Sequence, residues 1–206
     1  KPFLISMPQA ESEFSILIHY SEIGLKKNNR HYFEKIFINN ISKHIFDLKH
    51  TRIRLLSARV FIENVNPKDW DIYQVRLTNV MGLSSAVLML ESQSEYGAIK
   101  NAAEFLLDGE KFNSFRITTR RHAKSFKKTS IDVNVELGAY IQNKTKAKVQ
   151  LSGSDMNLII EILKDKSYIG FKKITGYGGL PTGSQETAIS LLSSGIDSPV
   201  SSFEII

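Results

Sequence analysis

The chain of 206 residues contains no cysteine, a single tryptophan and only five prolines. The lack of cysteine excludes disulfide frameworks, Cys-ligated zinc, iron–sulfur clusters and a cysteine nucleophile within this chain. Long apolar runs are missing too, and none approaches the roughly 20 residues needed to span a bilayer. Hydrophobic residues nevertheless make up 42% of the chain, which is typical of a globular protein. We therefore expect a cytoplasmic protein of one or two domains with no membrane segment.

Positive charge is in excess and is concentrated in two stretches. The chain has 27 Lys and Arg against 21 Asp and Glu, a net charge of +6. Residues 114–150 hold nine basic and two acidic residues, and residues 19–54 hold eight basic and three acidic residues. These stretches carry +7 and +5, so the rest of the chain carries −6. Such segregation indicates a polyanionic partner, with two ordinary solvated basic faces as the alternative.

The first third of the chain alternates strand and helix patterns. In chain order it predicts a strand at 16–20, a helix at 30–45, a hairpin of strands at 52–56 and 60–63, a helix after Asn66 and Pro67, and a strand at 85–90. Gly82 is expected to end the second helix, and Trp70 is expected to lie in the core. The order β-α-β-β-α-β predicts a ferredoxin-like, split-βαβ fold of the α/β (α+β) class.

A second, smaller α/β unit is predicted from about residue 95 to 173. In chain order it contains a helix at 96–107, a strand at 114–120, a helix from 130 to about 143, and strands at 148–151, 158–163 and 168–172. Thr129 and Asp132 have the spacing of a capping box, which predicts where its second helix begins. Phe115 alternates with Arg116 and is expected in the core. Phe126 is expected either in the core or as a stacking platform for bases.

A glycine-rich segment and a serine-rich loop follow this unit. Residues 175–184 include four glycines, which marks a boundary. Residues 188–192 are then expected to form a buried strand that leads into a loop at 193–198 and a helix near Pro199. Small residues and hydroxyl groups before a helix N-terminus favour phosphate, and Asp197 can help to hold a divalent cation. An ordinary polar turn is the alternative, and the Walker A pattern is absent.

Several sequence blocks together resemble a known family. Residues 191–200, Leu-Leu-Ser-Ser-Gly-Ile-Asp-Ser-Pro-Val, resemble the PP-loop motif of ATP pyrophosphatases, usually written SGGxDS. Blocks at 120–126, 129–133 and 176–183 precede it, and the opening block is Tyr20–Lys26 with Asn29, Arg30 and Phe33. In this order and spacing they resemble the tRNA 4-thiouridine synthetase (tRNA sulfurtransferase) family over nearly the whole chain.

The resemblance implies a domain order and a reaction. It implies an N-terminal ferredoxin-like domain at 1–92, a THUMP RNA-binding domain at 93–174, a Gly-rich linker at 175–186, and at 187–206 the first strand and loop of a Rossmann-like PP-loop ATP pyrophosphatase domain. In this family, ATP adenylates uridine 8 of tRNA, and persulfide sulfur from a cysteine desulfurase replaces the activated oxygen. The family is also implicated in thiamine thiazole synthesis. A homodimer that binds the tRNA acceptor end is expected.

The resemblance also implies site residues. The expected ligands of ATP and Mg²⁺ are Leu191, Leu192, Ser193, Ser194, Gly195, Asp197 and Ser198, with Asp197 toward the metal. The expected RNA-binding residues are Arg116, Arg120, Arg121, Lys124, Lys127 and Lys128, together with Lys26, Lys27 and Arg30. The family pattern has glycine where this chain has Ser194. If that position requires a positive φ, serine costs on the order of 1 kcal/mol.

No catalytic residue is expected within the chain, because the family's persulfide cysteine is absent from it. We therefore expect a fragment that does not transfer sulfur by itself. Three alternatives stay open: another RNA-modifying enzyme with a THUMP domain, such as a methyltransferase or pseudouridine synthase; a non-catalytic THUMP-type RNA-binding module; and an ATP pyrophosphatase acting on a small molecule. The five histidines lack metal-ligand spacing and are expected at edges or on the surface.

Overall fold

A nine-stranded sheet runs through the part of the chain that the structure describes, in the order β2-β3-β1-β4-β8-β7-β5-β6 with β9 beside β4. The computed structural model describes residues 13–56, 58–187 and 189–205. The strands are β1 Phe14–His19, β2 Arg52–Leu56, β3 Arg59–Val65, β4 Ser85–Gln93, β5 Ser114–Arg121, β6 Lys148–Val149, β7 Met156–Ile162, β8 Lys166–Gly170 and β9 Lys173–Thr175. The α-helices are α1 Arg30–His44, α2 Trp70–Thr78, α3 Tyr96–Leu107, α4 Ser130–Thr145 and α5 Asp197–Ile205, and the 3₁₀ helices are η1 Glu22–Leu25, η2 Lys27–Asn29 and η3 Pro67–Asp69.

The first half of the sheet is ferredoxin-like, as predicted. Strands β2, β3, β1 and β4 pair antiparallel in that order, which is the split-βαβ arrangement. Helices α1 and α2 cover one face, where Phe37, Trp70 and Tyr73 pack against the strands in one buried cluster. The side chain of Asn66 accepts a hydrogen bond from the backbone N of Lys68 (3.1 Å), and this cap starts η3 and α2.

Gly82 does not end α2, which stops at Thr78. Its φ is +97°, and an added Cβ would lie 3.1 Å from the Phe37 ring. Its backbone N donates to the carbonyl of Gly178 (2.6 Å), so the Gly-rich segment packs directly on the first half of the sheet. Gly82 is therefore required where two backbone segments approach each other, and the prediction that it caps the helix was wrong.

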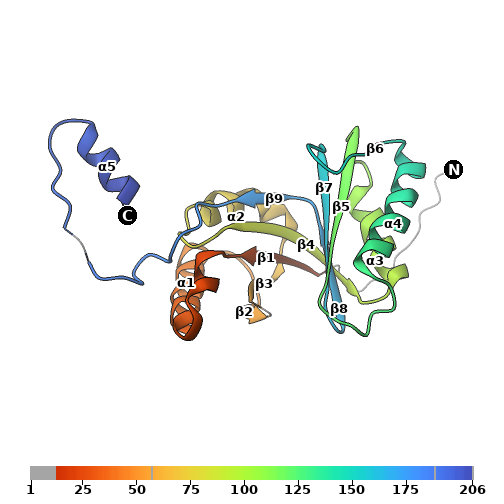
Figure 1. Ribbon diagram of the computed structural model, residues 1–206, viewed down its shortest axis with the longest axis horizontal. Coiled ribbons are helices and arrows are strands. Elements are labelled where there is room, and N and C mark those ends of the chain that lie inside the picture. Colours follow the sequence, from red (N-terminus) through yellow and green to blue (C-terminus); the bar gives the residue numbers. More distant parts are fainter. Residues whose placement is uncertain (1–12, 57, 188, 206) are drawn as a thin grey trace.

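The second half of the sheet has α3 and α4 on one side of β5 and β7 (Figure 1). Thr129 and Asp132 form the predicted capping box: each side chain accepts a hydrogen bond from the other residue's backbone N, at 3.1 and 2.8 Å. Phe115 and Phe126 are both buried in the core between these helices and the strands, so Phe126 is not a stacking platform.

Three strand predictions in this half need correction. Strand β6 has only two residues, because just Ser114 and Phe115 of β5 pair with it. Strand β8 begins at Lys166 and not at residue 168, which leaves a shorter connection after β7. Strand β9 was missed, since it is three residues long and pairs with β4, almost 90 positions earlier in the chain.

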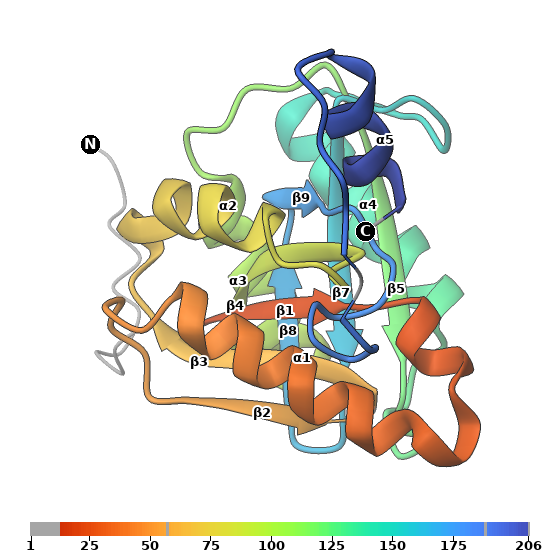
Figure 2. The same ribbon diagram turned by 90° about the vertical axis from the view of Figure 1, so that its left-hand side faces the viewer.

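Strand β4 joins the two halves. One of its sides pairs with β1, and the other pairs with β9 at Ser85–Val87 and with β8 at Leu90–Gln93. Strands β5, β7 and β8 run across β1, β2 and β3 (Figure 2). Between the halves lies a third buried cluster, made of Leu17, Phe61, Val87, Met89, Ile159 and Tyr168.

Residues 189–192 do not form the predicted buried strand. Ile189 and Leu191 are 90% and 89% exposed, and within the described ranges no strand pairs with this segment. Helix α5 begins at Asp197, with Pro199 in its first turn, and lies away from the sheet in Figure 1. Residues 1–12 of the predicted first domain, Ala188 and Ile206 lie outside the described residues. None of the described helices is both long enough and apolar enough to cross a membrane.

Candidate nucleic-acid interface

A buried carboxylate sits at the junction of the two halves. Glu161 lies in the apolar strand β7 and is only 1% exposed. The register of the parallel pair β5–β7 places Arg120 beside it, and His122 follows directly after β5. The first half contributes His19 from the end of β1 and Arg59 from the start of β3. Glu161 therefore collects four basic side chains from separate parts of the chain.

The shortest contact of this cluster joins Glu161 to His122. His122 Nε2 lies 2.6 Å from Glu161 Oε2, and Arg120 Nη1 lies 3.3 Å from Oε1. Arg59 Nη2 and His19 Nε2 are 3.6 and 3.7 Å from the carboxylate. Arg59 Nε (3.3 Å) and Arg120 Nη1 (3.2 Å) also approach His19 Nε2. Because a guanidinium group only donates, this nitrogen of His19 is the acceptor.

The charges around Glu161 keep it ionised. Burial alone raises the pKa of Glu161, but the hydrogen bond from His122 and the charge of Arg59 outweigh burial and hold that pKa below its ordinary value. Glu161 is therefore a carboxylate at neutral pH. Arg59 and Arg120 carry two positive charges against its single negative charge, so the cluster is positive even with both histidines neutral.

A cleft of about 460 Å³ adjoins this cluster. It is lined by Arg54, Leu56, His122, Ala123, Leu163, Lys164, Asp165, Lys166 and Tyr168. One wall is thus the β2 edge of the first half, and the other is the β7–β8 connection and the loop after β5. Such a cleft is open to a ligand that touches both halves at once.

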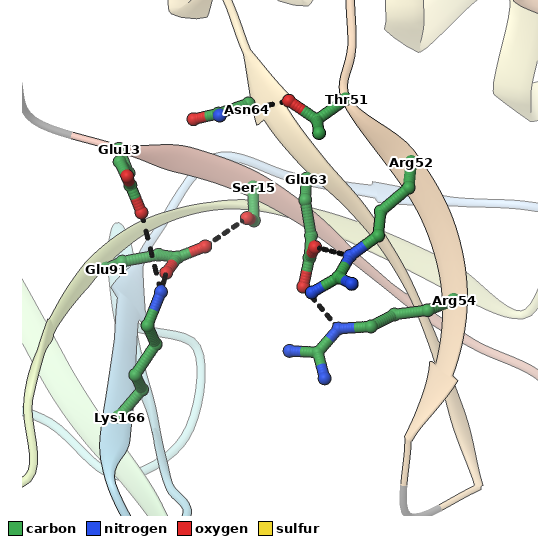
Figure 3. Close-up of polar contacts among 9 residues, drawn as sticks. All are labelled: Glu13, Ser15, Thr51, Arg52, Arg54, Glu63, Asn64, Glu91 and Lys166. Atoms are coloured by element: carbon green, nitrogen blue, oxygen red, sulfur yellow. Dashed lines mark hydrogen bonds and ion pairs between the residues drawn. The ribbon is translucent and has the colours of Figure 1, made fainter.

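Two side chains that line the cleft, Arg54 and Lys166, belong to separate groups of polar contacts, which Figure 3 shows. Arg52 and Arg54 on β2 both donate to Glu63 on β3. On the opposite side, Lys166 reaches Glu91 (2.6 Å) and Glu13 (3.4 Å), and Ser15 also donates to Glu91. Burial raises the pKa of Glu63, but the two arginines outweigh it and hold that pKa below its ordinary value.

The predicted RNA-binding residues near β5 have different surroundings. Arg121 donates to the carbonyls of Phe126 (3.1 Å) and Lys128 (3.2 Å), so it braces the loop between β5 and α4. Arg116 donates to the carbonyl of Leu151 (3.3 Å), and Lys128 pairs with Glu136 (2.6 Å). Lys124 and Lys127 are exposed and have no hydrogen bond or ion pair to any residue that the structure describes. These two are the most available to a new partner.

The second predicted set runs from Lys26, the residue between η1 and η2, through Lys27 on η2 to Arg30, the first residue of α1. Arg30 donates to Glu34 Oε1 and to the Tyr20 hydroxyl, both at 2.7 Å, while Lys26 lies over the Phe33 ring and Lys27 is exposed. No hydrogen bond or ion pair between described residues joins this set directly to the β5 set. The end of β1 lies between them, because Tyr20 contacts Arg30 and the preceding residue, His19, contacts Arg120.

The predicted nucleotide loop is a polar turn before α5. Ser198 Oγ accepts from the backbone N of Ser193 (2.8 Å), and Ser193 Oγ accepts from the backbone N of Gly195 (3.2 Å). Ser194 is not among the described residues with positive φ, so serine is not strained there. These hydroxyl and N–H donors before a helix suit a phosphate. Leu191 and Leu192 are exposed, and the described contacts of 189–205 include no hydrogen bond to the rest of the chain.

His19, Arg59 and Glu161 were missed as site residues. The one signal in the sequence is Glu161 itself, an isolated acidic residue inside the apolar run Leu158–Leu163. A carboxylate in such a run is expected to have a buried partner, but the neighbouring sequence does not identify that partner. His122 is exposed, as expected of a histidine at an edge or on the surface, but its contact with Glu161 was not predicted because nothing nearby in sequence marks Glu161 as its partner. No group of His, Asp and Glu side chains in the described ranges is arranged to hold a metal ion, and two arginines in the Glu161 cluster would repel one.

Two domain families match the chain in succession. Residues 15–86 match the family described as "ThiI ferredoxin-like domain", and residues 95–172 match the "THUMP domain" family. A relative from Moorella thermoacetica named "Probable tRNA sulfurtransferase" is 36% identical over 190 residues, which cover 92% of this chain and 48% of the relative. The chain spans about half the length of the curated relatives it matches.

Two solved structures are similar over most of the chain. PH1313 from Pyrococcus horikoshii superposes with a TM-score of 0.75 at 30% identity, covering 83% of this chain and 58% of that one. A 4-thiouridine synthetase–RNA complex with bound ATP superposes with a TM-score of 0.72 at 28% identity, covering 94% of this chain and 50% of that one.

Proposed function

The chain carries the ferredoxin-like and THUMP domains that form the N-terminal region of the ThiI family, and from this premise we propose that it binds the acceptor end of tRNA for 4-thiouridine formation. The observation that carries the proposal is the meeting of two basic sets at the end of β1. His19 contacts Arg120 of the second half, and the adjacent Tyr20 contacts Arg30 of the first. One RNA backbone can therefore touch both halves.

The relative solved as an RNA complex supports this proposal, since it aligns over 94% of the chain. Exposed cations suit the task because phosphate contacts supply most of the affinity for nucleic acids and fix the orientation of the RNA. Lys124 and Lys127 can reach phosphates without breaking an existing ion pair. Arg121 would act indirectly, by holding their loop in place through two carbonyl groups.

In the proposed reaction, this chain positions tRNA so that uridine 8 reaches an ATP-dependent sulfurtransferase centre. ATP, when bound, supplies the adenylyl group that makes the uridine O4 a leaving group. Ser193, Ser194, Gly195 and Ser198 would hold its phosphates, Asp197 would hold Mg²⁺, and Leu191 and Leu192 would lie beside the nucleotide. The chain has no cysteine, so the persulfide delivered by a cysteine desulfurase must be carried outside it. The whole protein would act as a homodimer.

The test is the salt dependence of tRNA binding. About six phosphate contacts give a slope of log K against log salt near −4 to −5, at roughly 0.7–0.9 per contact. Lys124→Gln with Lys127→Gln should weaken binding to any tRNA and make the slope shallower by about 1.4–1.8. The matched control is Lys68→Gln with Lys111→Gln, two exposed lysines outside both basic stretches, 19–54 and 114–150. A wild-type slope near zero, or equal losses in the two double variants, would contradict the proposal.

A further inference from the structure

The Gly-rich segment that follows β9 is fastened by its backbone to the first half of the sheet. The backbone N of Gly176 donates to the carbonyl of Ser84 (3.1 Å), and the backbone N of Gly178 donates to the carbonyl of Leu83 (2.8 Å). Gly176 is so close that an added Cβ would lie 2.4 Å from the carbonyl oxygen of Leu83. Glycine-rich linkers usually behave as flexible coils. Residues 176–182 are instead held against the turn before β4, and we call them the strap.

The end of the strap is held by α1 and by the core of the first half. The side-chain amide of Asn40 on α1 donates to the carbonyl of Thr182 (2.9 Å). Leu180 packs against the apolar cluster of the first half, and Pro181 is buried. The strap is therefore fixed at both ends, and the chain that leads to the serine loop departs from a defined point on the first half.

Glu22 holds the middle of the strap. Its Oε2 accepts a hydrogen bond from the backbone N of Gly179 (3.0 Å) and another from the Ser21 hydroxyl. Gly178 and Gly179 have φ angles of +73° and +72°, which residues with side chains rarely adopt. Because hydrogen bonds to an ionised acceptor are stronger than those to a neutral one, Glu22 gives the strap a charge-assisted contact.

Glu22 also belongs to the element that leads to the first basic set. It is the first residue of η1, and Lys26 directly follows that element. Ile23 is fully buried, and its Cδ1 lies 3.4 Å from the position that a Cβ would take at Gly82. Gly82 is the residue whose backbone N donates to the carbonyl of Gly178. The strap and the first basic set are therefore attached to the same short, packed element, so what restrains one also restrains the other.

We propose that docking of the strap is coupled to RNA binding at Lys26 and Lys27, and that Glu22 is the positioning residue that couples them. The inference rests on the proposed tRNA-binding function and adds a conformational role to it. A phosphate bound by these lysines would restrain η1 and, with it, the carboxylate that binds Gly179. Because coupling is reciprocal, a docked strap favours RNA binding by the same factor by which RNA favours docking. Bound RNA thus fixes where the chain toward the serine loop leaves the first half.

Hydrogen–deuterium exchange of the strap, measured with and without a saturating unmodified tRNA transcript, tests the coupling. Coupling between two sites is typically roughly 5–150-fold, so the transcript should slow wild-type exchange in residues 176–182 by about fivefold or more. In Glu22→Gln the strap should exchange faster than in wild type without RNA, and the transcript should have little effect on it.

The affinity of the same variant for the transcript separates coupling from electrostatics. If charge alone matters, removing an acidic residue close to Lys26 should tighten RNA binding, whereas loss of the coupling should weaken it by about fivefold. Asn40→Ala, which frees the end of the strap without changing any charge, should also weaken binding. Glu186→Gln removes an exposed carboxylate beyond the strap; it is the matched control and should not weaken binding.

The outcomes separate the two proposals. If wild type does not bind the transcript, the proposed function fails and the coupling fails with it. If wild type binds but the transcript leaves strap exchange unchanged, or if Glu22→Gln binds as tightly as wild type, only the coupling is overturned. Circular dichroism and thermal unfolding establish that each variant is folded. Asn40→Ala carries the test by itself if Glu22→Gln does not fold, and wild-type affinity for this variant would then overturn the coupling.

Discussion

At the residue scale, Glu161 shows how a charge can be placed inside an apolar strand. Burial of an unpaired carboxylate is strongly unfavourable, whereas a buried carboxylate with well-placed cations is tolerated. Here the partners come from β1, β3, β5 and the residue after β5. If only the carboxylate is removed, Arg59 and Arg120 are left close together without their shared anion.

The substitution Glu161→Gln is expected to destabilise the protein by about 2–3 kcal/mol at pH 7. This is below the roughly 3–5 kcal/mol for a fully buried pair, because the Arg120 side chain is 50% exposed. The pKa of Glu161 is lower in the folded state than in the unfolded chain. Its contribution is therefore present above about pH 4.3 and lost as the pH falls through the folded-state pKa.

Urea unfolding at pH 7, 5 and 3.5 measures this effect. The difference between wild type and Glu161→Gln should shrink toward pH 3.5, while Glu136→Gln, which breaks an exposed pair with Lys128, should cost less than about 1 kcal/mol throughout. A difference for Glu161→Gln that does not change with pH would show that its charge is not what stabilises the junction.

At the element scale, β8 passes so close to β4 that one of its positions has no room for a side chain. Gly170 pairs with Ile159 of β7, and on its other side an added Cβ would lie 2.0 Å from the carbonyl oxygen of Leu88. That oxygen belongs to the backbone of the shared strand and cannot move aside as a flexible side chain would. The junction of the two halves therefore depends on glycine at this position.

Gly170→Ala is expected to destabilise the protein by about 2–3 kcal/mol, since forcing atoms into a packed site typically costs 1–3 kcal/mol and here the obstacle is backbone. Gly97→Ala is the matched control. Gly97 lies in α3 with nothing within 4 Å of an added Cβ, so alanine should stabilise the helix by about 0.5–1 kcal/mol. Chemical denaturation of both variants checks the prediction, and equal effects would contradict it.

At the scale of the whole molecule, we expect the two halves to unfold as one unit. They share β4, and the third buried cluster lies between them. The single tryptophan, Trp70, is packed in the core of the first half, so its fluorescence reports on that half alone. Far-UV circular dichroism reports on both.

Leu137→Ala should test this coupling. Leu137 is fully buried on α4 in the core of the second half, and its truncation should cost about 2–5 kcal/mol. If the halves unfold together, the midpoint from Trp70 fluorescence should fall as far as the midpoint from circular dichroism. An unchanged Trp70 transition would show that the halves unfold independently.

The sequence by itself determined the ferredoxin-like order of elements, the cap at Asn66, the capping box at Thr129 and the succession of two domains, because periodicity and capping act between residues close in the chain. Only the tertiary structure shows which side chains surround Glu161 and that β8 and β9 both pair with β4. The partners of Glu161 include His19 and Arg59, which are 142 and 102 positions away, and no local pattern encodes such pairings. Residues 189–192 show the same limit: their apolar character permits a strand, but a strand forms only where another strand supplies its hydrogen bonds.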